Sequence, residues 1–138
     1  MPKQPIAAAK NICPCGGKQT YQQCCAPLHN GAAARDAEAL MRSRYSAFAL
    51  GLGEYIQRSW HSSTRPADTR ADAQDNNAAV KQQWIGLQIK RHELIDADHA
   101  RVEFIARYKI NGRAFALHEI SRFVRENGHW FYIDGELL

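Results

Sequence analysis

The residues best suited to chemistry in this chain are its four cysteines, which all lie between positions 13 and 25. They form two pairs, Cys13-Pro14-Cys15 and Cys24-Cys25, with eight residues between them. Four thiolates at the corners of a tetrahedron suit a Zn²⁺ ion about 2.3 Å from each sulfur. The spacing therefore predicts one structural zinc site made of Cys13, Cys15, Cys24 and Cys25, with no open position for water or substrate.

Two other arrangements of these thiols are conceivable. Disulfides are disfavoured because the apolar stretch 6–9 is too short for a secretory leader, and cytosolic thiols stay reduced. Adjacent cysteines such as Cys24 and Cys25 are also poorly spaced to bond each other. A second ligand set replaces Cys25 with His29 and leaves one thiol free, and the sequence alone leaves this choice open.

Positive charge is concentrated around the cysteines. The chain of 138 residues has a net charge of +4, and residues 1–35 hold no acid and four bases, Lys3, Lys10, Lys18 and Arg35. Four thiolates on one divalent ion carry a net charge of about −2, which nearby bases would compensate. This local role is favoured over nucleic-acid binding as the reason for the basic excess.

The segment ICPCGGKQTYQQCC resembles the SEC-C motif, a zinc element at the carboxyl end of the bacterial translocation ATPase SecA. That motif reads C-x-C, eight residues, then C-C or C-H, and its usual glycine-serine-glycine is here Gly16-Gly17-Lys18. The resemblance implies a metal held by the four cysteines. It also implies a protein partner, either a SecB-like chaperone or another export component.

Two later segments, LMRSRYSAFALGLGEYIQRSWHSSTRP and HEISRFVRENGHWFYIDGEL, together with the zinc element, resemble bacterial YchJ-like proteins over nearly the whole chain. The resemblance implies a SEC-C zinc-binding element over residues 1–35. It further implies a nuclear-transport-factor-two-like (NTF2-like) α+β domain over residues 36–138, with a cone shape. No activity is implied by this resemblance.

The pattern of residues predicts the helices of that domain. Asp36 is the predicted N-cap of a helix in which apolar residues recur at helical spacing as far as Leu52. Gly51 and Gly53 interrupt it, and a shorter helix is expected through residues 55–60. Residues 62–80 are polar and predict a long loop.

The carboxyl half has the alternating pattern of strands, which are predicted at 84–89, 101–110, 113–125 and 130–133. Asn111-Gly112 and Asn127-Gly128 separate the last three strands, and this dipeptide strongly favours a two-residue hairpin turn. Together the elements predict an α+β fold in which an antiparallel sheet packs on N-terminal helices and is preceded by the zinc element. The resemblance implies that this sheet is curved and cone-shaped.

The two turns also set a register, which places polar side chains on the apolar face of the sheet. Glu119 is expected opposite Phe104, and Asp134 opposite Ser121. Carboxylates on such a face are costly unless they are paired or open on a cavity. The candidate pocket consists of sheet residues and possible helix partners: Glu119, Ser121, Asp134, Tyr132, Arg44, Trp60 and His61. The alternative is a satisfied buried network that locks helix to sheet.

Two functions remain. The sequence has no phosphate loop or dinucleotide fingerprint, and no nucleophile with an adjacent base is evident. No apolar run approaches the roughly 18 residues that cross a bilayer. We therefore expect a cytoplasmic zinc-binding protein of unknown biochemical activity, and we favour a non-enzymatic role as a protein-interaction adaptor. The alternative is a small-molecule-binding or catalytic cone domain that uses the candidate pocket.

Overall fold

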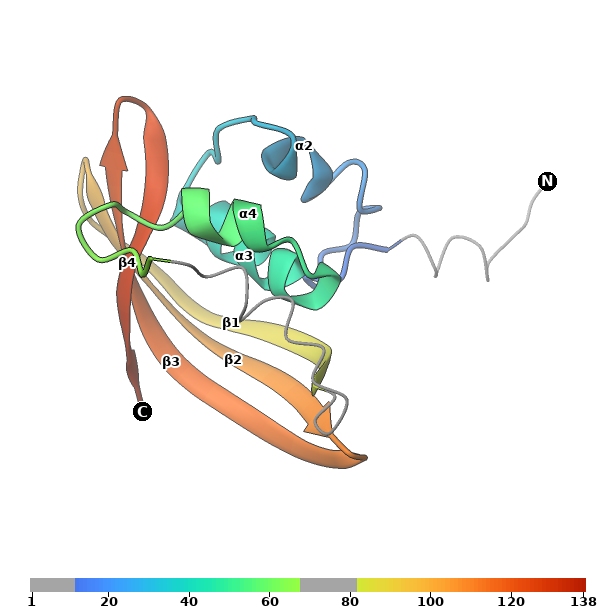
Figure 1. The fold of residues 1–138 in the computed structure, drawn as a ribbon. Helices are drawn as coiled ribbons and strands as arrows, with labels where there is room; N and C mark the ends of the chain where they lie inside the picture. The colour runs from blue at the N-terminus through green and yellow to red at the C-terminus, as the bar shows by residue number, and fades with distance from the viewer. Residues whose placement is uncertain (1–11, 68–81) are drawn as a thin grey trace.

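The computed structural model describes residues 12–67 and 82–138. One antiparallel sheet contains the strands in chain order: β1 (Gln82–Asp96), β2 (His99–Ile110), β3 (Arg113–Glu126) and β4 (His129–Leu137). The sheet is strongly curved, and one side of it carries the helices α2 (Ala26–His29), α3 (Ala37–Leu50) and α4 (Gly53–Arg58) (Figure 1). This architecture confirms the predicted α+β fold. Most of the predicted loop 62–80 lies outside the described residues.

Helix α3 begins and ends where its sequence dictates. The Asp36 carboxylate accepts a hydrogen bond from the backbone N–H of Ala39 at 2.8 Å, which confirms the predicted N-cap. Gly51 ends the helix in the left-handed region with φ of 75°, a conformation that glycine adopts without steric cost. The helix therefore ends at Leu50, which confirms the predicted interruption at Gly51.

Replacing Asp36 with alanine is expected to lower the free energy of unfolding by about 1 kcal/mol, because one backbone donor of α3 loses its acceptor. The matched variant Asp36→Asn retains a capping oxygen and should unfold within a few tenths of a kcal/mol of the wild type. Urea titration followed by circular dichroism measures both. Equal losses in the two variants would show that the cap does not stabilise the helix.

The two Asn-Gly turns form as predicted, with positive φ at all four residues, 53° and 80° at Asn111-Gly112 and 54° and 80° at Asn127-Gly128. These values are typical of the turn that matches the twist of a hairpin. The β2–β3 register is confirmed throughout, including Phe104 opposite Glu119. On β4 the pairing of Phe123 with Tyr132 is also confirmed.

Beyond Tyr132 the predicted register is wrong. A β-bulge shifts the pairing, so that Arg122 lies opposite Asp134 and Ser121 opposite Gly135. A shift of one residue moves a side chain to the other face of a sheet. The bulge lies beside a second contact of β4, in which the backbone of Tyr132 accepts from the N–H of His61 and donates to the carbonyl of Ser59.

One of the two hydrophobic clusters in the described residues joins the sheet, α3 and the cysteine loop. Its buried members on the sheet include Val102, Phe104, Phe123 and Trp130, and those on α3 include Leu40, Met41 and Tyr45. Cys13, Cys15 and Cys25 belong to the same cluster and are at most 2% exposed. Within the described ranges, no helix is long and apolar enough to cross a membrane.

Candidate metal centre and the adjoining cavity

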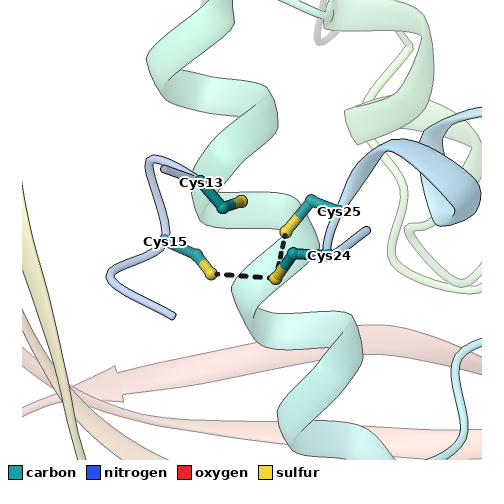
Figure 2. Close-up of side chains that lie close together, drawn as sticks. All are labelled: Cys13, Cys15, Cys24 and Cys25. Atoms are coloured by element: carbon teal, nitrogen blue, oxygen red, sulfur yellow. Dashed lines mark hydrogen bonds between the residues drawn. The ribbon is translucent and has the colours of Figure 1, made fainter. Parts of the chain in front are cut away.

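The cysteine loop is held by its own backbone. Ile12 and Thr20 form an antiparallel bridge, and the N–H of Cys13 donates to the carbonyl of Gln19 at 3.1 Å. Gly16 then turns the chain, with φ of 82° and its N–H bonded to the carbonyl of Cys13 at 3.1 Å. This turn brings the Cys13 and Cys15 side chains to the same side of the loop, facing Cys24 and Cys25 (Figure 2).

The four sulfurs fit one tetrahedral ion. All of them lie within 4.8 Å of one another, with 3.6 Å between Cys15 and Cys24 and 3.9 Å between Cys24 and Cys25. Sulfurs about 2.3 Å from an ion at tetrahedral corners are about 3.8 Å apart. Gly17 lies against the site, because a Cβ there would be 3.4 Å from the sulfurs of Cys15 and Cys24, in van der Waals contact. The cluster can therefore hold a metal ion.

Electrostatics within the cluster point to the same conclusion. Hydrogen bonds with Cys15 and Cys25 lower the pKa of Cys13 far below that of an ordinary thiol. Burial, followed by the contact with Cys15, raises the pKa of Cys24 to about 12. Hydrogen bonds with Cys13 and Cys15, together with burial, also raise the pKa of Cys25. Neighbouring thiols cannot all ionise alone, whereas a divalent cation deprotonates thiols that coordinate it.

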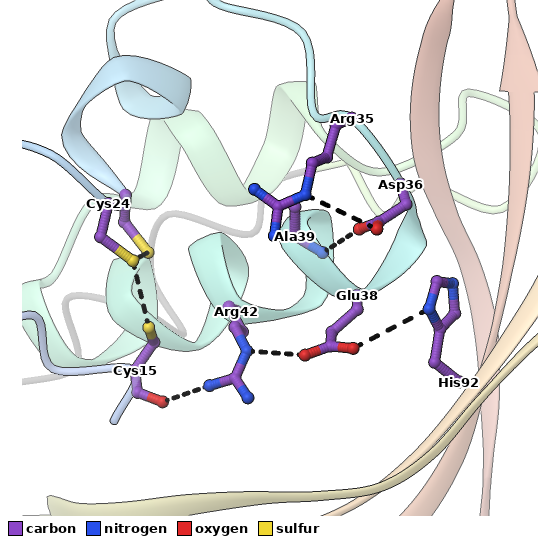
Figure 3. Close-up of polar contacts among 9 residues, drawn as sticks. Cys15, Cys24, Arg35, Asp36, Glu38, Ala39, Arg42 and His92 are labelled. Atoms are coloured by element: carbon purple, nitrogen blue, oxygen red, sulfur yellow. Dashed lines mark hydrogen bonds and ion pairs between the residues drawn. The ribbon is translucent and has the colours of Figure 1, made fainter. Parts of the chain in front are cut away.

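Helix α3 supplies the polar surroundings of the cluster. The hydroxyl of Ser46, which is fully buried, donates to the Cys25 sulfur at 3.2 Å and lies 3.4 Å from that of Cys13. Arg42 donates to the carbonyl of Cys15 at 3.0 Å and to Glu38 at 3.0 Å. Figure 3 shows these contacts, which run from Cys15 in the cysteine loop through Arg42 to Glu38 on α3. Arg42 is therefore a cation fixed beside the cluster.

Removing the Ser46 hydroxyl is expected to weaken metal binding by about tenfold to a hundredfold, because outer hydrogen bonds orient the ligands and stabilise their charge. The Ser46→Ala variant is compared with Ser62→Ala, which changes an exposed serine. Competition with a chromophoric chelator at fixed pH measures both affinities. Unchanged affinity in Ser46→Ala would show that this hydroxyl has no influence on the ion.

His29, the alternative ligand, is not among the clustered donors. Its Nε2 bonds the carbonyl of Ser43 at 2.8 Å and must therefore carry the proton. Its Nδ1 is 2.7 Å from the hydroxyl of Tyr21, from which it accepts. Burial lowers the pKa of His29, which favours this neutral ring. Both ring nitrogens are thus engaged, and the structure brings Cys25 to the cluster instead.

On the other side of α3 lies a cavity of about 260 Å³ between the helix and the sheet. Five of the seven predicted pocket residues line it: Arg44, Trp60, Glu119, Ser121 and Tyr132. Arg44 is 4% exposed, and its guanidinium lies 4.4 Å from the ring centroid of Tyr132 and 5.2 Å from that of Trp60. Burial lowers the pKa of Arg44 to about 10, so the side chain stays charged at neutral pH.

The two other predicted pocket residues lie elsewhere. Asp134 is displaced by the bulge to the opposite face, where it pairs with Arg122 at 2.7 Å. His61 bonds Glu126 at 2.8 Å and Ser63 at 2.7 Å, and does not line the cavity. The expected cluster of Glu119, Ser121 and Asp134 is therefore wrong in its third member.

Three functional neighbours were missed by the sequence reasoning. Ser46 and Arg42 touch the cysteine loop, and Gly135 makes room for Glu119, whose carboxylate would overlap a Cβ at that position. The helix also contains Glu38, Arg42, Ser43 and Arg44, so no signal in the sequence set Ser46 apart. Gly135 offered no signal either, because its position beside Glu119 results from the bulge in β4.

Comparison with known proteins supports this description. The family described as YchJ, middle NTF2-like domain, matches residues 36–135. A UPF0225 protein of Bordetella bronchiseptica is 48% identical, with 99% of both chains covered, and one of Ralstonia nicotianae is 47% identical, with 96% of both covered.

Two solved structures of SEC-C motif containing proteins resemble the chain. The solution structure from Rhodopseudomonas palustris has a TM-score of 0.80 and 31% identity, and covers 91% of this chain and 98% of that one. The crystal structure from Psychrobacter arcticus has a TM-score of 0.74 and 31% identity, with 88% and 80% covered. The resemblance stated from the sequence is thus confirmed. The chain belongs to the YchJ family, with an NTF2-like domain behind a SEC-C element and UPF0225 proteins among its relatives.

Proposed function

We propose that this protein is a zinc-dependent adaptor, in which one structural Zn²⁺ shapes the SEC-C element into a surface that binds a protein partner. The observation that carries the proposal is the four-sulfur cluster. Soft thiolates in a tetrahedral arrangement favour zinc among the common divalent ions. Four protein ligands leave no position for water or substrate, so the ion supports structure instead of catalysis.

The outer surface of the element supports the adaptor role. Several of its residues are exposed: Ile12, Lys18, Gln19, Gln22 and Gln23. Ile12 is 47% exposed and adds an apolar group to this face. Residues 12–35 contain no acid. A partner with an acidic, partly apolar surface would complement this face.

The partner proposed is a SecB-like chaperone or another export component, by similarity to the SecA element, and the compartment is the cytoplasm. Support for this compartment comes from the four cysteines, which are close together and are all free thiols. Thiols in this form persist in reducing compartments.

The test uses the full metal-loaded chain and purified SecB from the same organism, titrated by calorimetry at low and high salt. Lys18→Glu should weaken binding about tenfold, because it reverses one positive charge on the proposed contact surface. Lys109→Glu makes the same change at an exposed position on β2 and should bind like the wild type. Absence of binding would refute the chaperone link. Equal weakening in both variants would refute the SEC-C element as the contact surface.

A further inference from the structure

We propose that the cavity between α3 and the sheet is a receptor for a large apolar α-amino acid, with the carboxylate on Arg44 and the ammonium group on Glu119. The inference does not depend on the adaptor function, because none of the residues that carry it belongs to the cysteine loop.

Arg44 provides the anion-binding end. Its guanidinium makes two hydrogen bonds to described residues, both from Nη1, at 2.9 Å to the carbonyl of Ile56 and at 2.6 Å to the hydroxyl of Ser59. Among the described residues, no acceptor is bonded to Nε or Nη2. Buried donors without acceptors are costly, and a carboxylate accepts two parallel bonds from a guanidinium. The arginine therefore faces the cavity with donors available for an anion.

Glu119 provides the opposite charge. Its carboxylate lines the same cavity and accepts a hydrogen bond from the hydroxyl of Ser121 at 2.9 Å. Arg44 and Tyr132 also line this cavity. Within the described part of the chain, however, Glu119 and Arg44 form no ion pair within 4.0 Å. Two opposite charges thus face the cavity without neutralising each other directly.

The side chains that line the cavity indicate which ligand side chain would fit. Most of the lining is apolar or aromatic, including Tyr45, Phe48, Trp84 and Phe104. A volume of about 260 Å³ is below the range of about 300–1,000 Å³ that is usual for drug-sized ligands. The space suits a single large apolar side chain. A zwitterionic head group matches the charges, and an apolar side chain matches the walls.

Tryptophan indole resonances in an NMR titration of the full metal-loaded chain localise the binding. The chain has three tryptophans; Trp60 and Trp84 line the cavity, whereas Trp130 is buried in the core away from it. Addition of L-phenylalanine, L-leucine or L-methionine should move the indole N–H signals of Trp60 and Trp84 and leave that of Trp130 in place. No movement with any of the three at about 10 mM, or movement of Trp130 alone, would overturn the proposal.

Analogues test the two charges separately. 3-Phenylpropionate lacks the ammonium group, and phenethylamine lacks the carboxylate, so each should bind about tenfold or more weakly than L-phenylalanine. Affinities equal to that of the amino acid would show that the cavity recognises only the apolar body, and would also overturn the proposal.

A variant pair tests the role of Glu119. Glu119→Gln retains an oxygen that accepts from Ser121 but removes the charge, so L-phenylalanine affinity should fall about tenfold or more while 3-phenylpropionate affinity does not fall. The control Glu103→Gln changes an acid of the neighbouring strand β2, whose carboxylate is bonded to His118 at 2.7 Å. Equal losses in both variants would contradict the assignment.

Discussion

Replacing Cys25 with serine is expected to abolish stoichiometric metal binding and to expose the backbone of residues 12–34 to hydrogen exchange. Cys25 is 2% exposed, and its sulfur is both a proposed ligand and the acceptor of the Ser46 hydroxyl. Metal binding contributes about 10–16 kcal/mol to the folding of small zinc elements. Exchange measured by mass spectrometry should show lost protection in 12–34, while β2 and β3 remain protected.

Two further variants make this result specific. Gln22→Ser changes an exposed residue of the same element and should retain both metal and protection. His29→Ala should also retain the ion, because the His29 ring nitrogens bond Ser43 and Tyr21. Loss of the ion in His29→Ala together with its retention in Cys25→Ser would favour the alternative ligand set.

Metal affinity is expected to fall by about a hundredfold for each unit by which the pH is lowered. The pKa of Cys24 is raised to about 12 and that of Cys25 is also raised, so at neutral pH both thiols hold protons until a cation displaces them. Each proton released on binding changes the apparent affinity about tenfold per pH unit. Because both pKa values are raised, affinity should increase with pH across the neutral range, and metal-dependent stability should be lost on acidification.

Chelator competition at about pH 6 and pH 8, corrected for the titration of the chelator, measures this dependence. Calorimetry in buffers with different ionisation enthalpies counts the displaced protons directly, and at least two per ion are expected from Cys24 and Cys25. An affinity independent of pH would mean that the thiols are already ionised without metal. That result would contradict the raised pKa values of Cys24 and Cys25.

Local sequence determined most of the sheet. Asn111-Gly112 and Asn127-Gly128 each require positive φ and a two-residue turn, and this fixes which residues of the adjoining strands face each other. The register prediction was wrong only beyond Tyr132, where β4 also bonds Ser59 and His61. That contact joins segments about seventy residues apart, so no local pattern could reveal the bulge or the displacement of Asp134.

The candidate site was also predicted in part from the sequence. The spacing of the cysteines sufficed to group them, because the ligands of a compact zinc element are close in sequence. What periodicity could not show is that α3 serves two sites at once. Ser46 faces the sulfurs, whereas Arg44, two residues earlier, faces the cavity. A fixed metal centre should therefore also steady the helix that carries the anion-binding arginine.

X-ray absorption at the zinc edge, on protein purified under reducing conditions and analysed for its metal content, tests the proposed centre most directly. We predict one zinc per chain and a single shell of four sulfurs at about 2.3 Å. Nitrogen or oxygen in that shell, or a chain whose cysteines are reduced and which contains no stoichiometric metal, would contradict the four-thiolate site formed by Cys13, Cys15, Cys24 and Cys25.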